Sequence, residues 1–368
     1  MKQIQIMKCS AFLFLLIPCL AFAGNKGEVA EKKINRVFSI ESNGRVSIDN
    51  KYGDIDIAIG ESRSVRFDIT VTVKAGSLKK AQEGLDRISV EFSEGLNRVD
   101  AETVIESSSS WMSWFSSGNV EMEIDYQVLV PADVYLDLLN RYGSIYLEKT
   151  DRDIRIDIGY GDIRLGDINA KLELDMAYSD GSISQIRNGE LNLSYSDLQM
   201  ENSDVLEVNM KYTDLVMGSA IRLNLVSAYG DCKGMDVDEI TYEGKYDDVA
   251  FDRVKSIDAE AGYTGIHLSG LDQKGQFDMR YGDLSIDHIG PGFSSLNINT
   301  SYTGVVLGFS SGTSFSVDAE TEYCDIHHSD LKVTEEIERS SSRIFKGSRG
   351  AGGGKIVARM NYGELSID

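Results

Sequence analysis

The sequence contains few of the residues that cross-link chains, interrupt strands or carry out catalysis. Its 368 residues include four cysteines, four histidines, three prolines and two tryptophans. Cys9 and Cys19 lie in an N-terminal segment that we expect to be removed, and the remaining Cys232 and Cys324 cannot form a disulfide framework. No Ser/His/Asp or Cys/His arrangement for nucleophilic catalysis stands out. The composition therefore favours a protein that is not an enzyme and carries no cofactor.

Positive charge is also scarce in this chain. Lys and Arg total 37 against 59 Asp and Glu, a formal net charge of −22, and removal of Lys2 and Lys8 would take it to −24. Phosphate backbones repel such a chain, which makes nucleic acid a poor partner. A hydrophobic content of 42% with 35 glycines still indicates a turn-rich folded chain.

Long apolar runs are missing outside the first 23 residues. There, Lys2 and Lys8 precede the apolar stretch 11–17, and Ala21 and Ala23 form a small-x-small pattern, which predicts a signal peptide cleaved after Ala23. Lipidation at Cys19 is the alternative, although Pro18 stands where a lipobox has a small residue. No later run approaches 18 apolar residues, so we expect no membrane span and a location in the periplasm or at the cell surface, associated with the outer membrane.

A repeat organises the rest of the chain. Its unit is a tyrosine, a small or polar residue, usually an aspartate, and then an aliphatic residue, and the tyrosines from Tyr142 to Tyr281 follow one another at steps of 17 or 18 residues. The series is Tyr52, Tyr142, Tyr160, Tyr178, Tyr195, Tyr212, Tyr229, Tyr246, Tyr263, Tyr281, Tyr302, Tyr323 and Tyr362.

Each repeat unit has the pattern of β-strands. Apolar residues alternate before the tyrosine, as at Leu172, Leu174 and Met176, and the alternation resumes after the turn. A unit of 17 residues is too short for a helical crossover, so successive units should stack in parallel. The repeat predicts an all-β parallel β-helix of about 13 coils, roughly 60 Å long at ~4.8 Å per coil.

Two segments interrupt the period. We expect residues 24–61 to form the first coils, 62–135 an inserted antiparallel cap, 136–331 the main solenoid, 332–355 a polar mobile loop and 356–368 the last coil. The cap would contain strands near residues 65–73, 98–106 and 119–130 and a short helix within 77–87. Its serine-rich tip holds Trp111, Trp114 and Phe115, which could cover the first coil, bind a ligand or touch a membrane.

Stacked coils would align equivalent residues into columns. We expect the tyrosines to form an aromatic ladder that faces inward, because they share the parity of Leu174 and Met176. Glycine after the tyrosine would supply a positive φ, and the aspartate two residues after the tyrosine would cap the turn. A calcium ladder along these aspartates is the alternative, but the nonapeptide of calcium-binding β-rolls is absent.

An acidic column lies three residues before the tyrosines, on the solvent face. We predict a binding surface there, an electrostatic platform for weakly held divalent cations or a basic partner, with a merely solubilising face as the alternative. Its candidate binding residues are Asp157, Asp175, Glu243, Glu260 and Asp278.

One cluster contains metal-ligand residue types. Alternation along a strand sends Asp325 and His327 to one side and Cys324 and His328 to the other, so four ligands cannot converge. We therefore predict no metal site, and expect His328 to be buried and hydrogen-bonded.

Three short motifs resemble those of the bacterial putative-adhesin family, exported domains of unknown function. The matching segments are residues 44–55, residues 126–131, and the C-terminal glycine run with Asn361 to Leu365. The resemblance implies a right-handed parallel β-helix in the cell envelope, and it supplies no catalytic residues.

Together these observations predict an exported β-solenoid that acts as an adhesin, a ligand-binding surface or a structural element. The expected partners are a glycan or a protein ligand at the cell surface. The main alternative is a polysaccharide-active β-helix enzyme, a lyase or hydrolase, which would need paired carboxylates or a calcium site in a groove built from long loops.

Overall fold

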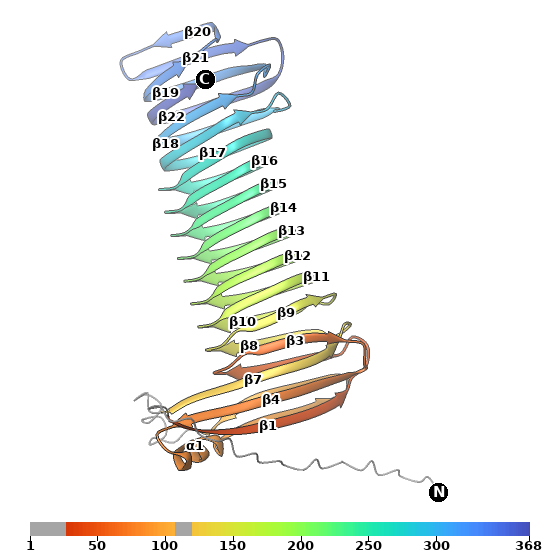
Figure 1. Ribbon diagram of the computed structural model, residues 1–368. Coiled ribbons are helices and arrows are strands. Elements are labelled where there is room, and N and C mark those ends of the chain that lie inside the picture. The colour runs from red at the N-terminus through yellow and green to blue at the C-terminus, as the bar shows by residue number, and fades with distance from the viewer. Residues whose placement is uncertain (1–26, 107–119) are drawn as a thin grey trace.

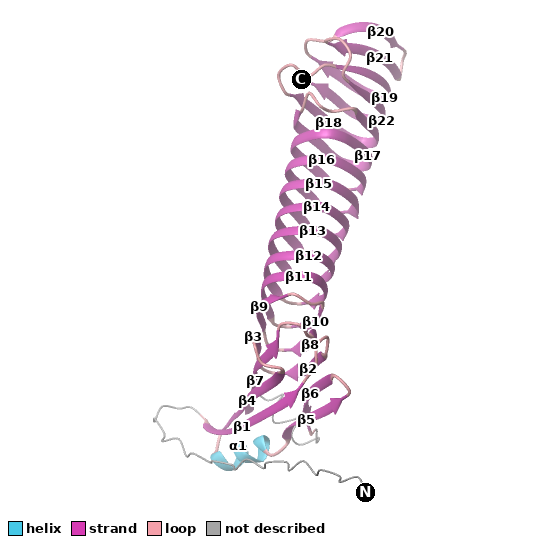
Figure 2. Cartoon of the chain, turned by 90° about the vertical axis from the view of Figure 1, so that its right-hand side faces the viewer, coloured by secondary structure: helices cyan, strands magenta, loops and turns pink. Residues whose placement is uncertain are grey.

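The described part of the chain folds into a long rod of stacked strands, with one short helix near the N-terminal end of the rod (Figure 1). This computed structural model describes residues 27–106 and 120–368. The rod is narrow and gently curved, and antiparallel strands lie at both of its ends (Figure 2).

In the middle of the rod most coils consist of one long strand that ends just before a tyrosine. Neighbouring strands pair in parallel and in register, so that Leu174 lies beside Leu191, which lies beside Val208. The predicted all-β parallel solenoid is thereby confirmed. The strands are β11 (Asp162–Ala177), β12 (Asp180–Ser194), β13 (Asp197–Lys211), β14 (Asp214–Ala228), β15 (Asp231–Lys245), β16 (Asp248–Gly262), β17 (Gly265–Ile289) and β18 (Ser295–Phe309).

The core of the rod is made of inward columns of aliphatic and aromatic side chains. In β12, Gly189, Leu191 and Leu193 point inward at two-residue spacing, whereas Ile183, Ile186 and Gly189 follow one another in steps of three. Alternation places one side chain in two inside a straight strand, and a step of three turns the chain at a corner. Each coil therefore encloses its own slice of a continuous core.

The first coils are assembled from strands that are far apart in the sequence. β2 pairs in parallel with β6 on one side and β8 on the other, and β3 lies between β7 and β9 in the same way. β8 and β9 then continue into β10 and β11. These strands are β2 (Arg45–Lys51), β3 (Ile55–Gly60), β6 (Arg98–Ile105), β7 (Val120–Pro131), β8 (Tyr135–Arg141), β9 (Ile145–Thr150) and β10 (Ile154–Gly159).

An antiparallel layer covers the N-terminal end of the rod. β4 (Ser64–Ala75) pairs antiparallel with both β7 and β1 (Glu28–Ser39), and β5 (Ile88–Gly95) pairs antiparallel with β6. Helix α1 (Leu78–Leu85) begins at the N-cap Ser77 and packs on β1 and β4. β1 therefore belongs to the cap, and the expectation that residues 24–61 contain only coils is wrong for this strand. The expectation that residues 62–135 form only an antiparallel cap is wrong for β6 and β7, which pair in parallel with β2 and β3 as parts of the first coils. An antiparallel pairing can extend a sheet over the open end without another coil.

The C-terminal end departs from the order of the sequence. β22 (Gly354–Ile367) lies between β18 and β19 (Phe315–His328) and pairs in parallel with both. The last segment is therefore a coil, as expected, but it is not the outermost one.

The segment expected to be a mobile loop is a hairpin instead. β20 (Lys332–Glu338) and β21 (Ser342–Arg349) pair antiparallel, and β21 also pairs antiparallel with β19. Ile344 and Phe345 lie in β21, and Phe345 is fully buried. Burial of Phe345 outweighs the polar composition that favoured a loop, and only the glycine-rich residues 350–353 connect the hairpin to β22.

Candidate functional site

Thirteen tyrosines form a continuous ladder along one corner of the rod. Adjacent rings are stacked with centroids 4.7–5.1 Å apart and ring planes within 18° of parallel. Near the C-terminus the order is Tyr302, Tyr362, Tyr323, because β22 lies between β18 and β19. The predicted ladder is confirmed.

The inward orientation predicted for these rings is wrong. The twelve tyrosines from Tyr142 onward are 39–56% exposed. Every ladder tyrosine has a positive φ, between 51° and 61°. The left-handed turn interrupts the alternation on which the parity argument depended, so the tyrosine side chain leaves the core and the next residue enters it. The tyrosine itself, rather than the glycine that follows it in several coils, takes the positive φ.

Where the residue after the tyrosine is a serine or threonine, its hydroxyl caps the turn from inside. Ser179 and Ser196 are buried, and each hydroxyl donates to the carbonyl two residues before it at 2.9 Å. The same hydroxyl oxygens accept an N–H from the preceding coil, as Ser196 Oγ does from the Ser179 N–H at 3.2 Å. The aspartate column contributes less: Asp54 accepts the Ser144 N–H at 2.8 Å and Asp214 accepts the Asp231 N–H at 3.0 Å.

The five predicted acidic residues line one groove on the outer face of the rod. Parallel register places Glu243 beside Glu260, and Glu260 beside Asp278, in successive coils. The groove has a volume of about 830 Å³ and runs from β10 to β17. The acidic side of this groove, which we call the acidic groove, is formed by Asp157, Asp175, Glu243, Glu260 and Asp278, with Asn192, Asn209 and Val226 in the same column.

The opposite wall of the acidic groove was not predicted from the sequence. It consists of the residues that directly precede the tyrosines: three are basic, Lys211, Lys245 and Arg280, and the others that line the groove are small. The sequence contained a signal for this wall: its residues lie two positions after the acidic column, and residues two apart on a strand share a face. The groove therefore runs directly beside the corner that carries the tyrosine ladder.

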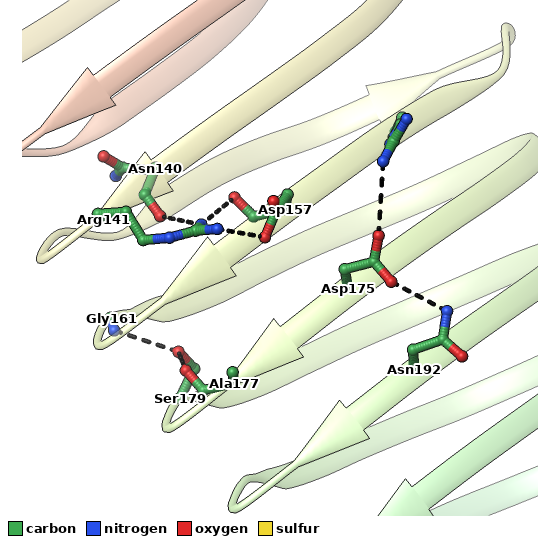
Figure 3. A network of polar contacts seen from close by, with 9 residues as sticks. Asn140, Arg141, Asp157, Gly161, Asp175, Ala177, Ser179 and Asn192 are labelled. Atoms are coloured by element: carbon green, nitrogen blue, oxygen red, sulfur yellow. Dashed lines mark hydrogen bonds and ion pairs between the residues drawn. The ribbon is translucent and has the colours of Figure 1, made fainter.

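The N-terminal part of the acidic groove is held by a polar network (Figure 3). The Arg141 guanidinium donates to Asp157 Oδ1 at 2.8 Å, and Asn192 Nδ2 donates to Asp175 Oδ1 at 2.9 Å. Arg155 lies 3.7 Å from the Asp175 carboxylate. Beyond the end of the groove, burial is the main cause that raises the pKa of Asp49, which occupies the same column.

Further along the acidic groove the carboxylates have fewer partners. Asn299 Nδ2 donates to Asp278 Oδ2 at 2.9 Å. Within the part of the chain that the structure describes, Glu243 and Glu260 have no ion-pair or hydrogen-bond partner for their side chains. These two neighbouring carboxylates are therefore available to a ligand.

The histidine cluster does not converge on a metal. His327 Nε2 lies 3.5 Å from Glu364 Oε1, on the outside of the rod. Among residues 27–106 and 120–368 no group of three or more His, Cys, Asp or Glu side chains is arranged to hold a metal ion. His328 was expected to be buried, and this is wrong: it is exposed and contacts the Phe345 ring, with centroids 4.9 Å apart.

The aromatic tip predicted as a second binding region, with Trp111, Trp114 and Phe115, lies outside the described residues, as does the predicted signal peptide. In the described ranges, no helix is long and apolar enough to cross a bilayer.

Two solved structures illustrate the similarity of this chain to other proteins. A putative adhesin from Parabacteroides distasonis is 10% identical with a TM-score of 0.38, and the match covers 71% of this chain and 97% of that one. A putative cell adhesion protein from Clostridium sporogenes is 10% identical with a TM-score of 0.19, covering 92% of this chain and 99% of that one. These scores carry no argument about function, and no curated protein matches the chain.

The family assignment depends on a sequence model instead. The model described as Toastrack DUF4097 matches residues 103–368, which include the whole regular array and its C-terminal end. This range is well over half of the chain. The chain therefore belongs to the Toastrack DUF4097 family.

Proposed function

We propose that this chain is an exported cell-envelope protein that binds an extended ligand along its acidic groove and catalyses no reaction. One observation carries the proposal: five acidic residues spread over more than a hundred positions of sequence line a single groove that crosses the successive coils. A groove whose chemistry repeats with every coil suits a ligand that is itself long and repetitive. An adhesin role at the cell surface, with a glycan or a protein as ligand, fits this geometry.

The second candidate function, a polysaccharide hydrolase, has one supporting feature. Retaining glycosidases place two carboxyl groups about 5 Å apart, and neighbouring strands lie at roughly that spacing. Glu243 and Glu260 are such a pair. A hydrolase, however, needs its two carboxyl groups in different environments so that one holds a proton. These two occupy equivalent positions on successive coils, which favours binding over catalysis.

A structural role through end-to-end stacking of rods has less support. Both ends carry antiparallel strands in place of an open coil. The outermost strand at the C-terminal end is charged, because β20 contains Lys332, Glu335, Glu336 and Glu338. Charged edge strands discourage pairing with another sheet. Binding along the side of the rod is therefore favoured over polymerisation at its ends.

A glycan-array screen of residues 24–368, together with calcium titration, tests the proposal. The groove variant Glu243→Gln, Glu260→Gln, Asp278→Asn removes three carboxylates from the acidic groove. A matched variant, Glu201→Gln, Asp204→Asn, Asp252→Asn, removes the same number of charges from exposed sites six or nine residues after a tyrosine. We expect the groove variant to lose at least tenfold in affinity, about 1.4 kcal/mol, for any glycan that binds, and the matched variant to keep it.

Two outcomes would contradict the proposal. Equal losses in the two variants would show that net charge alone drives binding. Shortening of an oligosaccharide by the wild-type protein, abolished by Glu243→Gln, would instead establish the hydrolase. Heat release at millimolar calcium that disappears in the groove variant would show that the acidic groove binds divalent cations.

A further inference from the structure

We propose that the tyrosine ladder, with the carboxylate columns on both sides of it, binds an extended polypeptide segment rich in lysine and arginine. This inference deepens the proposed function and rests on it, because the ladder adjoins the acidic groove. It assigns a class of partner to the tyrosine ladder, which sequence parity had predicted to lie in the core.

The first argument is the size of the exposed aromatic surface. Ladder tyrosines from Tyr142 onward are about half exposed, and a tyrosine side chain offers about 200 Å², so twelve of them present roughly 1,200 Å² in one line. The largest apolar patch on a typical monomer is about 300–600 Å², and larger patches mark interaction sites. A phenol row of this length therefore indicates a partner.

The second argument is that the turn itself does not require tyrosine. A positive φ is conformationally costly for a bulky residue, whereas glycine and asparagine take this conformation readily. The ladder repeats that cost at thirteen positions. Stacking between neighbouring rings offsets part of this cost, but it does not explain why tyrosine stands at the turn in place of glycine or asparagine. A surface function supplies the missing reason.

The third argument is charge. The carboxylates of the acidic groove lie on one side of the ladder, where they outnumber the three basic residues Lys211, Lys245 and Arg280 that stand between them and the rings. On the other side, the residues two positions after the tyrosines form a second column that consists mostly of carboxylates. Most of these are exposed: Asp162, Asp180, Asp197, Asp214, Asp248, Asp283, Asp325 and Glu364. A second copy of this chain, an anionic lipid surface or an acidic glycan would place like charges together, which is unfavourable. The flanking columns therefore fit a cationic partner.

Ring geometry favours a polypeptide over a sugar chain. Sugars stack on the open face of an aromatic ring, but here each ring covers its neighbour's face at about 4.9 Å. The exposed parts are ring edges and phenol groups, along which the alkyl stem of a lysine or arginine can lie while its charge reaches a carboxylate. A lysine of the chain itself already approaches the ladder, because Lys211 Nζ is 5.3 Å from the Tyr212 ring centroid.

The dimensions define a probe. Seven coils span about 34 Å at ~4.8 Å each, and an extended peptide rises about 3.3 Å per residue, so about ten to twelve residues cover this stretch. A fluorescent peptide of that length with alternating lysine and alanine, and a matched peptide with glutamine for lysine, can be titrated against residues 24–368. Fluorescence anisotropy at low and at high ionic strength reports the affinity and its electrostatic share.

Two triple variants separate the rings from the charges. Tyr195→Asn, Tyr212→Asn, Tyr229→Asn removes three adjacent rings and keeps residues that accept a positive φ, which protects the fold. Asp180→Asn, Asp197→Asn, Asp214→Asn removes three flanking charges and keeps hydrogen-bond acceptors. We expect each variant to weaken lysine-peptide binding by about fivefold or more, roughly 1 kcal/mol. The matched variant at Glu201, Asp204 and Asp252 should change it by less than twofold.

Wild-type affinity in the tyrosine variant, or an equal loss in the matched charge variant, would overturn the inference. Binding of the glutamine peptide as tightly as the lysine peptide would also overturn it. Glycan or calcium binding that depends on Glu243 and Glu260 without any binding of the lysine peptide would sink this inference and leave the proposed function standing. If the protein bound no glycan, no calcium and no lysine peptide, both the proposed function and this inference would be contradicted. Far-UV circular dichroism and unfolding curves confirm that each variant is folded.

Discussion

The middle of the rod and its two ends use the same type of strand but connect it differently. From β11 to β17 each coil pairs with the coil that directly follows it in sequence. At the C-terminal end β22 pairs with β18 and β19, and at the N-terminal end β2 pairs with β6 and β8. The middle is therefore held by local contacts along the chain, and the ends by contacts between distant segments.

This difference has a physical reason. A middle coil has a partner on each of its two edges: the preceding unit of the repeat on one edge and the following unit on the other. A terminal coil has one open edge, which would pair with other molecules unless it is covered. Inserting β22 and folding β20 and β21 over β19 covers that edge with the chain's own residues. Because the ends are capped in this way, the order of strands along the rod there differs from their order in the sequence.

The largest expected effect compares a buried leucine in each region. Leu223 in β14 and Leu365 in β22 are both fully buried. We expect Leu223→Asp and Leu365→Asp each to cost about 4 kcal/mol or more, because an unpaired carboxylate enters the core. Hydrogen exchange should show lost protection on both sides of β14 in the first variant, and only from β18 to β22 in the second. Loss of protection along the whole rod in both variants would abolish the distinction.

The next effect concerns a coil of the middle that departs from its neighbours. Tyr242 is buried and donates to Asp247 Oδ2 at 2.7 Å, while Asp247 Oδ1 accepts the Gly230 N–H at 3.0 Å. A Cβ on Gly244 would clash with the Tyr242 hydroxyl, so glycine at this position leaves room for the buried phenol. Asp247→Ala should cost about 2–3 kcal/mol by leaving two buried donors unpaired.

A rescue variant sharpens this prediction. Tyr242→Leu, Gly244→Leu, Asp247→Ser copies the coil that contains Leu191, Leu193 and Ser196 at the equivalent positions. We expect its free energy of unfolding, measured in urea, to return to within about 1 kcal/mol of the wild-type value, since volume-conserving changes are well tolerated. A rescue variant no more stable than Asp247→Ala would show that the coils are not interchangeable even in the middle.

A smaller effect separates backbone strain from ring stacking in the ladder. Tyr212 has a φ of 51°. Both Tyr212→Asn and Tyr212→Val remove one ring from the stack, but valine is poorly suited to a positive φ whereas asparagine accepts it. We expect the valine variant to be about 1–2 kcal/mol less stable than the asparagine variant in urea unfolding. Equal stabilities would mean that the turn relaxes and that φ is not held by the coil.

The smallest effect is a pH dependence at the N-terminal end. Burial, and then the nearby Asp54 carboxylate, raises the pKa of Asp125 in the folded protein, although a hydrogen bond from the Asp54 N–H opposes the shift. A raised carboxyl pKa means that the folded state binds the proton more tightly. The stability it contributes therefore grows as pH falls through the folded pKa and is complete below the unfolded value of 3.8.

Replacement of this side chain checks the sign. Asp125→Asn should gain about 0.5 kcal/mol at pH 7 and lose that advantage near pH 4, measured by urea unfolding at both values. Asp133 is a control of opposite sign, because the Arg63 guanidinium that donates to it lowers its pKa. Asp133→Asn should therefore destabilise at pH 7. A destabilised Asp125→Asn at pH 7 would contradict the account.

Sequence periodicity predicted the position of the acidic column better than it predicted the orientation of the tyrosine ladder. Asp157, Asp175, Glu243, Glu260 and Asp278 could be aligned because they precede the turn on a regular strand, where parity is reliable. The tyrosines stand at the turn itself, where a positive φ ends that parity. A run of bulky residues at a left-handed position is rare enough that the pattern favoured glycine for this conformation. Residue identity alone could not show which residue takes it.

The 17-residue period by itself determined that strands stack in parallel, which residues align in columns and that the solvent face is acidic. Only the tertiary structure decided which way the tyrosines point, that residues 332–349 form a hairpin and that the final strand inserts one coil below the end. The repeat is a local property, since each coil meets its neighbour in the chain. A turn conformation and the cover over an open edge depend on contacts that the repeat does not contain.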